Sequence, residues 1–168
     1  TPKIRDIGYV RRTLGELVLS FMMLRNIQKS PLSNMIWGGI VWYSPTIFFG
    51  PLVKVLKKKC ECQSYLIVRD IFPEWAADLG LISRGIIYKF FKVFESYQYS
   101  VANVIGVQTA ANLPYFDKWE KRDGRRIEVL HNWLAKAPNV GSSFSVIKST
   151  LAGRLIFVYA GNMGIAQG

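Results

Sequence analysis

Histidine and cysteine are scarce in this chain of 168 residues, which has one histidine, His131, and two cysteines, Cys60 and Cys62. A lone imidazole lacks the partner ligands of a metal site, and a C-x-C pair offers too few ligands for structural zinc. A disulfide between such close neighbours would be strained, so we expect reduced thiols in a cytosolic protein. The sequence therefore predicts no metal site.

Acidic residues are also few: 11 Asp and Glu stand against 22 Lys and Arg, which gives a formal net charge of +11. This positive charge indicates which partners the protein could attract and says nothing about its fold. Nucleic acid, anionic lipid and phosphorylated substrates are all negatively charged and fit it. Apolar residues make up 50% of the chain and aromatic residues 14%, which is ample for a packed core and argues against wholesale disorder. The length suits one domain of typical size.

Charge is missing altogether from Ser30 to Val53. A run of this length is long enough to cross about 30 Å of hydrocarbon. Three prolines and three glycines interrupt it, however, so we expect no transmembrane helix there. No signal peptide is visible at the start of the chain.

Segments typical of strands alternate with segments typical of helices. Apolar residues at helical spacing predict helices at 14–27, 49–58, 86–101 and 110–121. Short apolar runs predict buried strands at 35–42, 63–69, 104–107, 127–130 and 155–159. This order indicates an α/β domain with a mainly parallel sheet, and such sheets bind ligands at the carboxyl ends of their strands.

The densest polar group follows the predicted strand at 63–69. Arg69, Asp70, Glu74 and Trp75 all lie within the segment 69–75. Carboxylates and Arg hydrogen-bond hydroxyl groups, and Trp offers a flat apolar face, so the segment is a candidate site for a polyhydroxylated ligand. The alternative is structural: Arg69 and Asp70 pair to close a loop, and Trp75 belongs to the core. The residues alone favour neither interpretation.

Two segments resemble motifs of a known enzyme family. Residues 69–81 (RDIFPEWAADLGL) and 159–168 (YAGNMGIAQG) are similar to the retaining glycosyltransferases of family 4, specifically to bacterial members that build O-antigen, capsule or exopolysaccharide. The two segments occur in the family's order, and residues 35–168 are covered. The resemblance implies the two-domain GT-B fold, in which a Rossmann-like N-terminal domain binds the acceptor and a second domain binds the nucleotide-sugar.

The resemblance also implies a domain division and roles for single residues. Residues 1–135 would be a partial acceptor-side domain, 136–153 a connector, and 154–168 the first strand and turn of a truncated donor-binding domain. The implied catalytic residue is Asp70, and the implied acceptor-binding residues are Arg69, Glu74, His131 and Asn132. The implied donor-binding residues, in a turn that approaches the diphosphate, are Gly161, Asn162, Met163 and Gly164. Enzymes with this fold generally need no metal, so we expect no cofactor.

The chain departs from the family pattern in three places. Nothing before Leu14 supplies the glycine-rich loop that many members carry after their first strand. Many members have a histidine in the loop that Asp70 occupies here, and this difference bears on the role of Asp70. The basic residues and the paired glutamates of the second domain are absent too.

A lysine cluster lies beside aromatic residues and has two interpretations. It resembles a membrane-surface patch, in which each Lys near anionic lipid contributes on the order of 1 kcal/mol. Alternatively, the lysines complement the dipole at a helix C-terminus. The membrane interpretation is preferred, and its residues are Lys54, Lys57, Lys58 and Lys59, with Trp37, Trp42, Phe48 and Phe49.

The sequence and the resemblance together predict part of a glycosyltransferase that moves a sugar from a nucleotide-sugar to a polyprenyl-diphosphate-linked acceptor. We expect a cytoplasmic enzyme, peripheral on the inner face of the cytoplasmic membrane, and a fragment that is inactive alone. The alternative is a non-catalytic basic module that binds membrane or nucleic acid. Single-strand binders interleave aromatic and basic residues on a sheet, a pattern this chain lacks, so nucleic acid is not an expected partner.

Overall fold

The computed structural model describes residues 9–44, 46–132, 135–136 and 149–157. The chain divides into two compact units, Thr1–Asn132 and Trp133–Gly168, and the helices and strands below all lie in the first.

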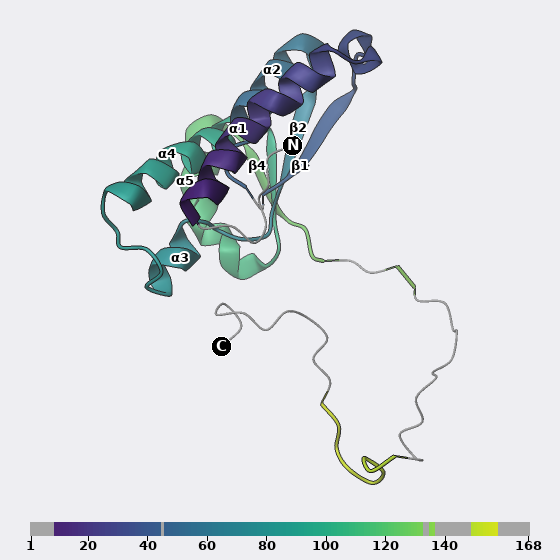
Figure 1. Cartoon of the computed structure of the whole chain (residues 1–168), viewed down its shortest axis with the longest axis vertical. Coiled ribbons are helices and arrows are strands. Elements are labelled where there is room, and N and C mark those ends of the chain that lie inside the picture. Colours follow the sequence, from purple (N-terminus) through teal and green to yellow (C-terminus); the bar gives the residue numbers. More distant parts are fainter. Residues whose placement is uncertain (1–8, 45, 133–134, 137–148, 158–168) are drawn as a thin grey trace. The chain divides into compact units, whose positions relative to one another are not determined.

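A four-stranded parallel sheet forms the centre of the first unit (Figure 1). Its strands are β1 (Gly39–Tyr43), β2 (Gln63–Val68), β3 (Val104–Val107) and β4 (Arg126–Val129), and they pair in chain order. Trp42 lies opposite Leu66, Leu66 opposite Ile105, and Ile105 opposite Ile127. The α/β class with a parallel sheet that the sequence predicts is therefore confirmed, and it is consistent with a Rossmann-like fold.

Helices precede and connect the strands. They are α1 (Tyr9–Gln28), α2 (Gly50–Cys60), α3 (Glu74–Asp78), α4 (Ile86–Val101) and α5 (Leu113–Asp123), with short 3₁₀ turns η1 (Pro31–Asn34) and η2 (Ala110–Asn112). Local sequence explains two of these helices. α2 and α5 each have a proline in the first turn, where its missing N–H costs nothing, and each ends at a residue in the left-handed region, Glu61 and Gly124.

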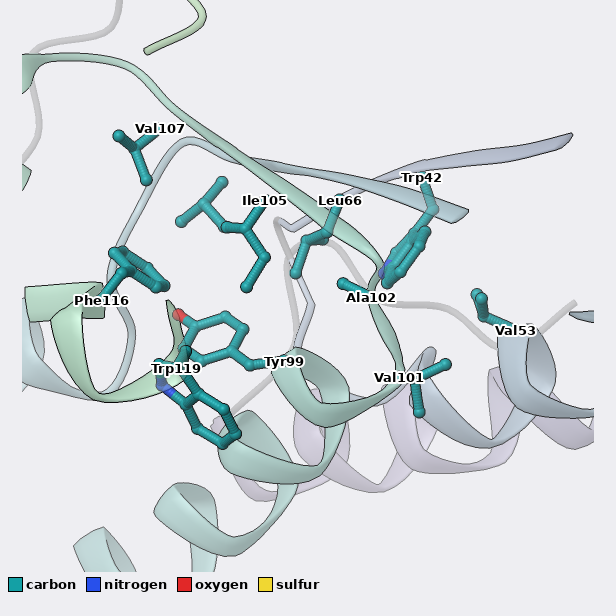
Figure 2. Packing of buried hydrophobic residues seen from close by; sticks show 11 residues of the cluster. Trp42, Val53, Leu66, Tyr99, Val101, Ala102, Ile105, Val107, Phe116 and Trp119 are labelled. Carbon is teal, nitrogen blue, oxygen red and sulfur yellow. The ribbon is translucent and has the colours of Figure 1, made fainter. Parts of the chain in front are cut away.

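Buried apolar residues from the sheet and three helices form one core (Figure 2). Leu66, Val68, Ile105 and Val107 of the strands are fully buried. Tyr99 of α4 packs edge-to-face against Phe116 and Trp119 of α5, with ring centroids 5.1 and 5.7 Å apart. Because each strand pairs with the next one in the chain, right-handed crossovers bring these helices to the same face of the sheet.

Residues that alternate with the core residues point to the opposite face of the sheet. On the edge strand β1, Val41 and Tyr43 are 69% and 38% exposed. Further in, Gly106 of β3 is covered by the ring of Tyr65, whose hydroxyl donates a hydrogen bond to Glu128 Oε1 at 2.9 Å. The absence of a side chain at position 106 is what allows this close approach.

Several predicted elements need correction. β1 begins at Gly39 rather than at residue 35, and the helix predicted at 110–121 is divided into η2 and α5. The strand predicted at 155–159 is not formed over its described residues, 155–157, which lie outside any regular element. Leu155 and Phe157, expected to be buried, are 92% and 93% exposed. The rest of that segment lies outside the described residues.

The apolar residues whose spacing predicted the helix at 14–27 are not all buried against the domain. Leu17, Leu24 and Ile27 are half-buried, as expected, but Leu14, Val18 and Phe21 are 58%, 48% and 64% exposed. Periodicity detects an apolar stripe but does not say which part of a wide stripe contacts the core. Among the described residues, no helix is both long and apolar enough to cross a bilayer.

Candidate functional site

The candidate site is an open pocket of about 390 Å³ at the carboxyl end of β2. Strand β2 ends at Val68, the loop 69–73 follows, and α3 begins at Glu74. The lining residues come from this loop, from α3, and from η2 and α5 after the neighbouring strand β3. They are Arg69, Asp70, Ile71, Glu74, Trp75, Asp78, Asn112 and Tyr115.

Arg69 and Asp70 are both exposed at the pocket and do not pair with each other. The Arg69 guanidinium lies over the Tyr43 ring, 5.7 Å from its centroid, and the Arg69 backbone N–H donates to Ser44 Oγ at 3.3 Å. Among the ion pairs and side-chain hydrogen bonds of the described residues, none uses the Asp70 carboxylate. The loop-closing Arg–Asp pair that the sequence left open is therefore not formed, and the Asp70 carboxylate is an acceptor that no described residue engages.

Glu74 is held by three donors on neighbouring helices. Lys92 Nζ lies 2.8 Å from Glu74 Oε1, and the Tyr115 hydroxyl donates to the same oxygen at 2.9 Å. The Tyr88 hydroxyl donates to Oε2. Burial opposes ionisation of Glu74, but the hydrogen bonds from Lys92, Tyr88 and Tyr115 outweigh it and lower the pKa of Glu74 below its usual value. Glu74 therefore lines the pocket as an ionised carboxylate whose position is fixed by these three hydrogen bonds.

A second carboxylate, Glu95, contacts two of the residues that hold Glu74. Glu95 of α4 is fully buried, and its Oε2 lies 2.7 Å from Lys92 Nζ, while its Oε1 contacts the Tyr115 hydroxyl. Burial, followed by the contact with Glu95, raises the pKa of Tyr115 above its usual value. Burial and the hydrogen bond to Glu74 raise the pKa of Tyr88 to about 12. Both phenols therefore remain protonated donors at neutral pH.

Trp75 supplies an aromatic surface to the pocket. Its side chain is 39% exposed, and its ring lies 6.1 Å from that of Phe72, with the planes tilted by 55°. Trp75 is thus an exposed residue, and the structural alternative, in which it belongs to the core, is wrong. Nearby, Asp78 is engaged by an exposed ion pair with Arg84 at 2.7 Å.

Sequence reasoning missed two residues that line the pocket, Asn112 and Tyr115, and two that hold Glu74 from α4, Tyr88 and Lys92. Asn112 and Tyr115 follow the carboxyl end of β3, the strand next to β2. Their position in a parallel sheet is a signal that could have identified them, because ligands bind where neighbouring strands end. Lys92 gave no such signal, since its role depends on where α4 packs.

His131 and Asn132 are not among the residues that line the pocket. They follow β4, and His131 Nδ1 lies 3.1 Å from the Gln108 carbonyl oxygen. Gln108 Nε2 donates to Asn132 Oδ1 at 3.5 Å. The structure thus groups Arg69, Asp70 and Glu74, and it gathers His131 and Asn132 with Gln108 at the ends of β3 and β4. The predicted donor-binding residues Gly161, Asn162, Met163 and Gly164 lie outside the described residues.

The structure buries two of the aromatic residues expected beside the lysine cluster of α2 and engages two of its lysines, while Lys54, Lys58 and Lys59 are exposed. Phe48 and Trp42 are 4% and 8% exposed and belong to the interior. Lys57 Nζ donates to the Val101 carbonyl at 2.8 Å, and Lys59 Nζ donates to the Ser33 carbonyl. Lys57, Lys58 and Lys59 form the last turn of α2, where positive charge complements the helix dipole.

Metal-ligating residues are dispersed in the part of the chain that the structure describes. No group of three or more His, Cys, Asp and Glu side chains there is placed to hold a metal ion. Cys60 is buried and Cys62 half-buried, and both are free thiols. Comparisons with protein-family models, with curated proteins and with solved structures gave no match to this chain.

Proposed function

We propose that the pocket at the end of β2 binds the acceptor of a retaining glycosyltransferase. The enzyme would transfer a sugar, an N-acetylated hexosamine or a deoxyhexose, from a nucleotide-sugar to a polyprenyl-diphosphate-linked acceptor in bacterial cell-surface polysaccharide synthesis. The observation that carries the proposal is an unengaged carboxylate, Asp70, next to the exposed indole of Trp75 in one pocket.

The composition of the pocket suits a sugar ring. The flat face of an indole packs against the apolar C–H face of a pyranose, and carboxylates and guanidinium groups hydrogen-bond its hydroxyls. Trp75 supplies the first group, and Asp70 and Arg69 supply the second. The network of Lys92, Tyr88 and Tyr115 around Glu74 keeps this wall of the pocket rigid, and a preformed wall reduces the entropic cost of binding.

Asp70 is the residue we assign to the chemical step. In a retaining transfer, the acceptor hydroxyl attacks the anomeric carbon from the face on which the nucleotide diphosphate leaves. The new C–O bond forms as the bond to the phosphate breaks, and the hydroxyl proton must be removed. The Asp70 carboxylate can accept the hydrogen bond of that hydroxyl and orient or deprotonate it, and general-base assistance contributes about 10² to 10⁴-fold in rate.

The donor half of the reaction rests on the resemblance alone. Gly161, Asn162, Met163 and Gly164 would approach the donor diphosphate through backbone N–H groups, which stabilise the departing negative charge. A lipid-linked acceptor lies at a membrane, so we place the enzyme in the cytoplasm, peripheral on the inner face of the cytoplasmic membrane.

Binding of a soluble acceptor analogue to the 168-residue chain tests the proposed function. The probe is N-acetylglucosamine 1-diphosphate, titrated while the ¹H–¹⁵N resonances of the tryptophan indoles are followed. We expect the Trp75 indole to shift on saturation and Trp75→Ala to weaken binding about tenfold, in keeping with the roughly 1.5 kcal/mol of an aromatic contact. Lys121→Ala, a change of an exposed residue on α5, serves as control and should bind normally. Unchanged affinity in Trp75→Ala would refute the assignment of the pocket.

A further inference from the structure

Helix α1 is attached to the domain by one face only. Ser20 is 3% exposed, and its hydroxyl donates a hydrogen bond to the Phe48 carbonyl oxygen at 2.5 Å. Leu17, Leu24 and Ile27 lie on the same side and are half-buried. This side fixes the helix against the segment before α2.

The outer face of α1 is apolar as well. Val10, Leu14, Val18 and Phe21 are 74%, 58%, 48% and 64% exposed. They fall at positions i, i+4, i+8 and i+11, which is one continuous stripe on a helix of 3.6 residues per turn. A contiguous exposed apolar stripe of this kind marks an interaction surface.

Basic residues accompany the stripe. Arg25 continues it by one turn, and Arg11 and Lys29 are exposed close to its two ends. Arg12 pairs with Glu16, the one acidic residue of the helix, at 2.9 Å. Arg11, Arg25 and Lys29 appear in none of the ion pairs of the described residues, so their charge is available to an anionic partner.

We propose that the outer face of α1 docks on an anionic lipid bilayer. Val10, Leu14, Val18 and Phe21 enter the interface between headgroups and acyl chains, and Arg11 and Arg25 contact the lipid phosphates. An anionic bilayer offers both hydrocarbon and negative charge along one plane, which is what an apolar stripe flanked by arginines requires. No described helix can span a bilayer, so the contact is interfacial. The inference deepens the proposed peripheral location by naming the surface that makes contact.

Vesicle sedimentation of the 168-residue chain tests the inference, with vesicles of phosphatidylcholine alone and of phosphatidylcholine with phosphatidylglycerol. We expect binding to the anionic vesicles only. The double variant Leu14→Ser with Phe21→Ser should lower the partition coefficient roughly 100-fold, because two large apolar side chains no longer leave water. Arg11→Ala with Arg25→Ala should lower it on the anionic vesicles as well.

The chain offers a matched control for the apolar variant. Leu155 and Phe157 are 92% and 93% exposed in the second unit, so Leu155→Ser with Phe157→Ser removes the same two side-chain types from another place. This control should bind vesicles as the unmodified chain does. An equal loss in both double variants would show non-specific adhesion and overturn the inference.

Two further outcomes would also overturn it. One is an unmodified chain that does not bind anionic vesicles. The other is an α1 variant that still binds them but changes from dimer to monomer in size-exclusion chromatography, which would assign the stripe to a contact between copies. Titration with N-acetylglucosamine 1-diphosphate without vesicles separates this inference from the proposed function. A chain that binds the sugar diphosphate but not vesicles would overturn the inference about α1 and leave the proposed function standing. A chain that binds vesicles but not the sugar diphosphate would overturn the proposed function alone.

Discussion

The ammonium group of Lys92 lies 2.8 Å from Glu74 Oε1, so a residue in the middle of α4 fixes a carboxylate at the start of α3. The same ammonium lies 2.7 Å from the buried Glu95. One cation therefore pairs with a carboxylate that lines the pocket and with a carboxylate of the interior. Substitutions of Lys92 and of Glu74 test this pair of contacts.

Lys92→Met should destabilise the protein. It leaves Glu95 buried without its cation, and removing one partner of a buried ion pair costs about 3 to 5 kcal/mol, with the lower end expected because Lys92 is 20% exposed. Urea denaturation measures the change. Lys121→Met, which removes an exposed pair with Asp117 at 4.0 Å, is the control and should cost under about 1 kcal/mol. Equal effects in the two variants would contradict the role of Lys92.

Glu74 should contribute to stability in a defined pH range. Its pKa is lower in the folded protein than in the unfolded chain, so its contribution is fully present above the unfolded value of about 4.3. That contribution is lost as pH falls through the lower folded value. Glu74→Gln should therefore flatten the decline of melting temperature with acidification below about pH 5. An identical acid profile in Glu74→Gln would exclude a stabilising ionised Glu74.

Asp70→Asn should separate function from stability. Asp70 is exposed and has no partner among the described contacts, so we expect its loss to change the free energy of unfolding by under about 0.5 kcal/mol. In a transferase assay of the complete enzyme, the same change should lower kcat about 100-fold or more while the Kd for the nucleotide-sugar stays constant. A stable Asp70→Asn enzyme with near-normal turnover would rule out the catalytic role.

Gly106→Ala should be strongly destabilising although it adds one methyl group. The new Cβ would overlap the ring of Tyr65, and overpacking of this kind costs about 1 to 3 kcal/mol. Combining Gly106→Ala with Tyr65→Ala should recover part of the loss. Gly38→Ala, where nothing lies within 4 Å of the added atom, is the neutral comparison. Additive effects in the double variant would show that the two residues do not interact.

Periodicity predicted the fold class well because it depends on which residues are apolar. The strand at Val104–Val107 and the helix at Ile86–Val101 have the bounds that were predicted. The strand is a short apolar run with clear limits, and the helix is a strongly periodic one. The outward orientation of Leu14, Val18 and Phe21 was not predictable, because it depends on where α1 meets the segment before α2. The apolar residues of this helix are visible in the sequence, but the segment against which some of them pack is not.

The candidate site shows the same division. The segment after β2 identified Arg69, Asp70, Glu74 and Trp75, because a polar group at a strand end is visible in the sequence. The engagement of Glu74 by Lys92, Tyr88 and Tyr115 was invisible, since it joins residues that are far apart in the chain. Contacts of that kind arise from packing, and a local pattern does not report them.

Strand β1 also affects how the protein behaves at high concentration. In the described part of the chain it is an outer strand of the sheet, and Gly39–Tyr43 contains neither a charge nor a proline. The unpaired N–H and C=O groups along such a strand can template a strand from another molecule, and a lysine on the edge strand is one device by which natural sheets prevent this. Val41 is 69% exposed, so it is the position of β1 at which a lysine side chain could reach solvent. Val41→Lys should therefore raise the concentration up to which the chain stays monomeric, measurable by light scattering, while the pocket after the neighbouring strand β2 keeps its affinity for the N-acetylglucosamine 1-diphosphate probe.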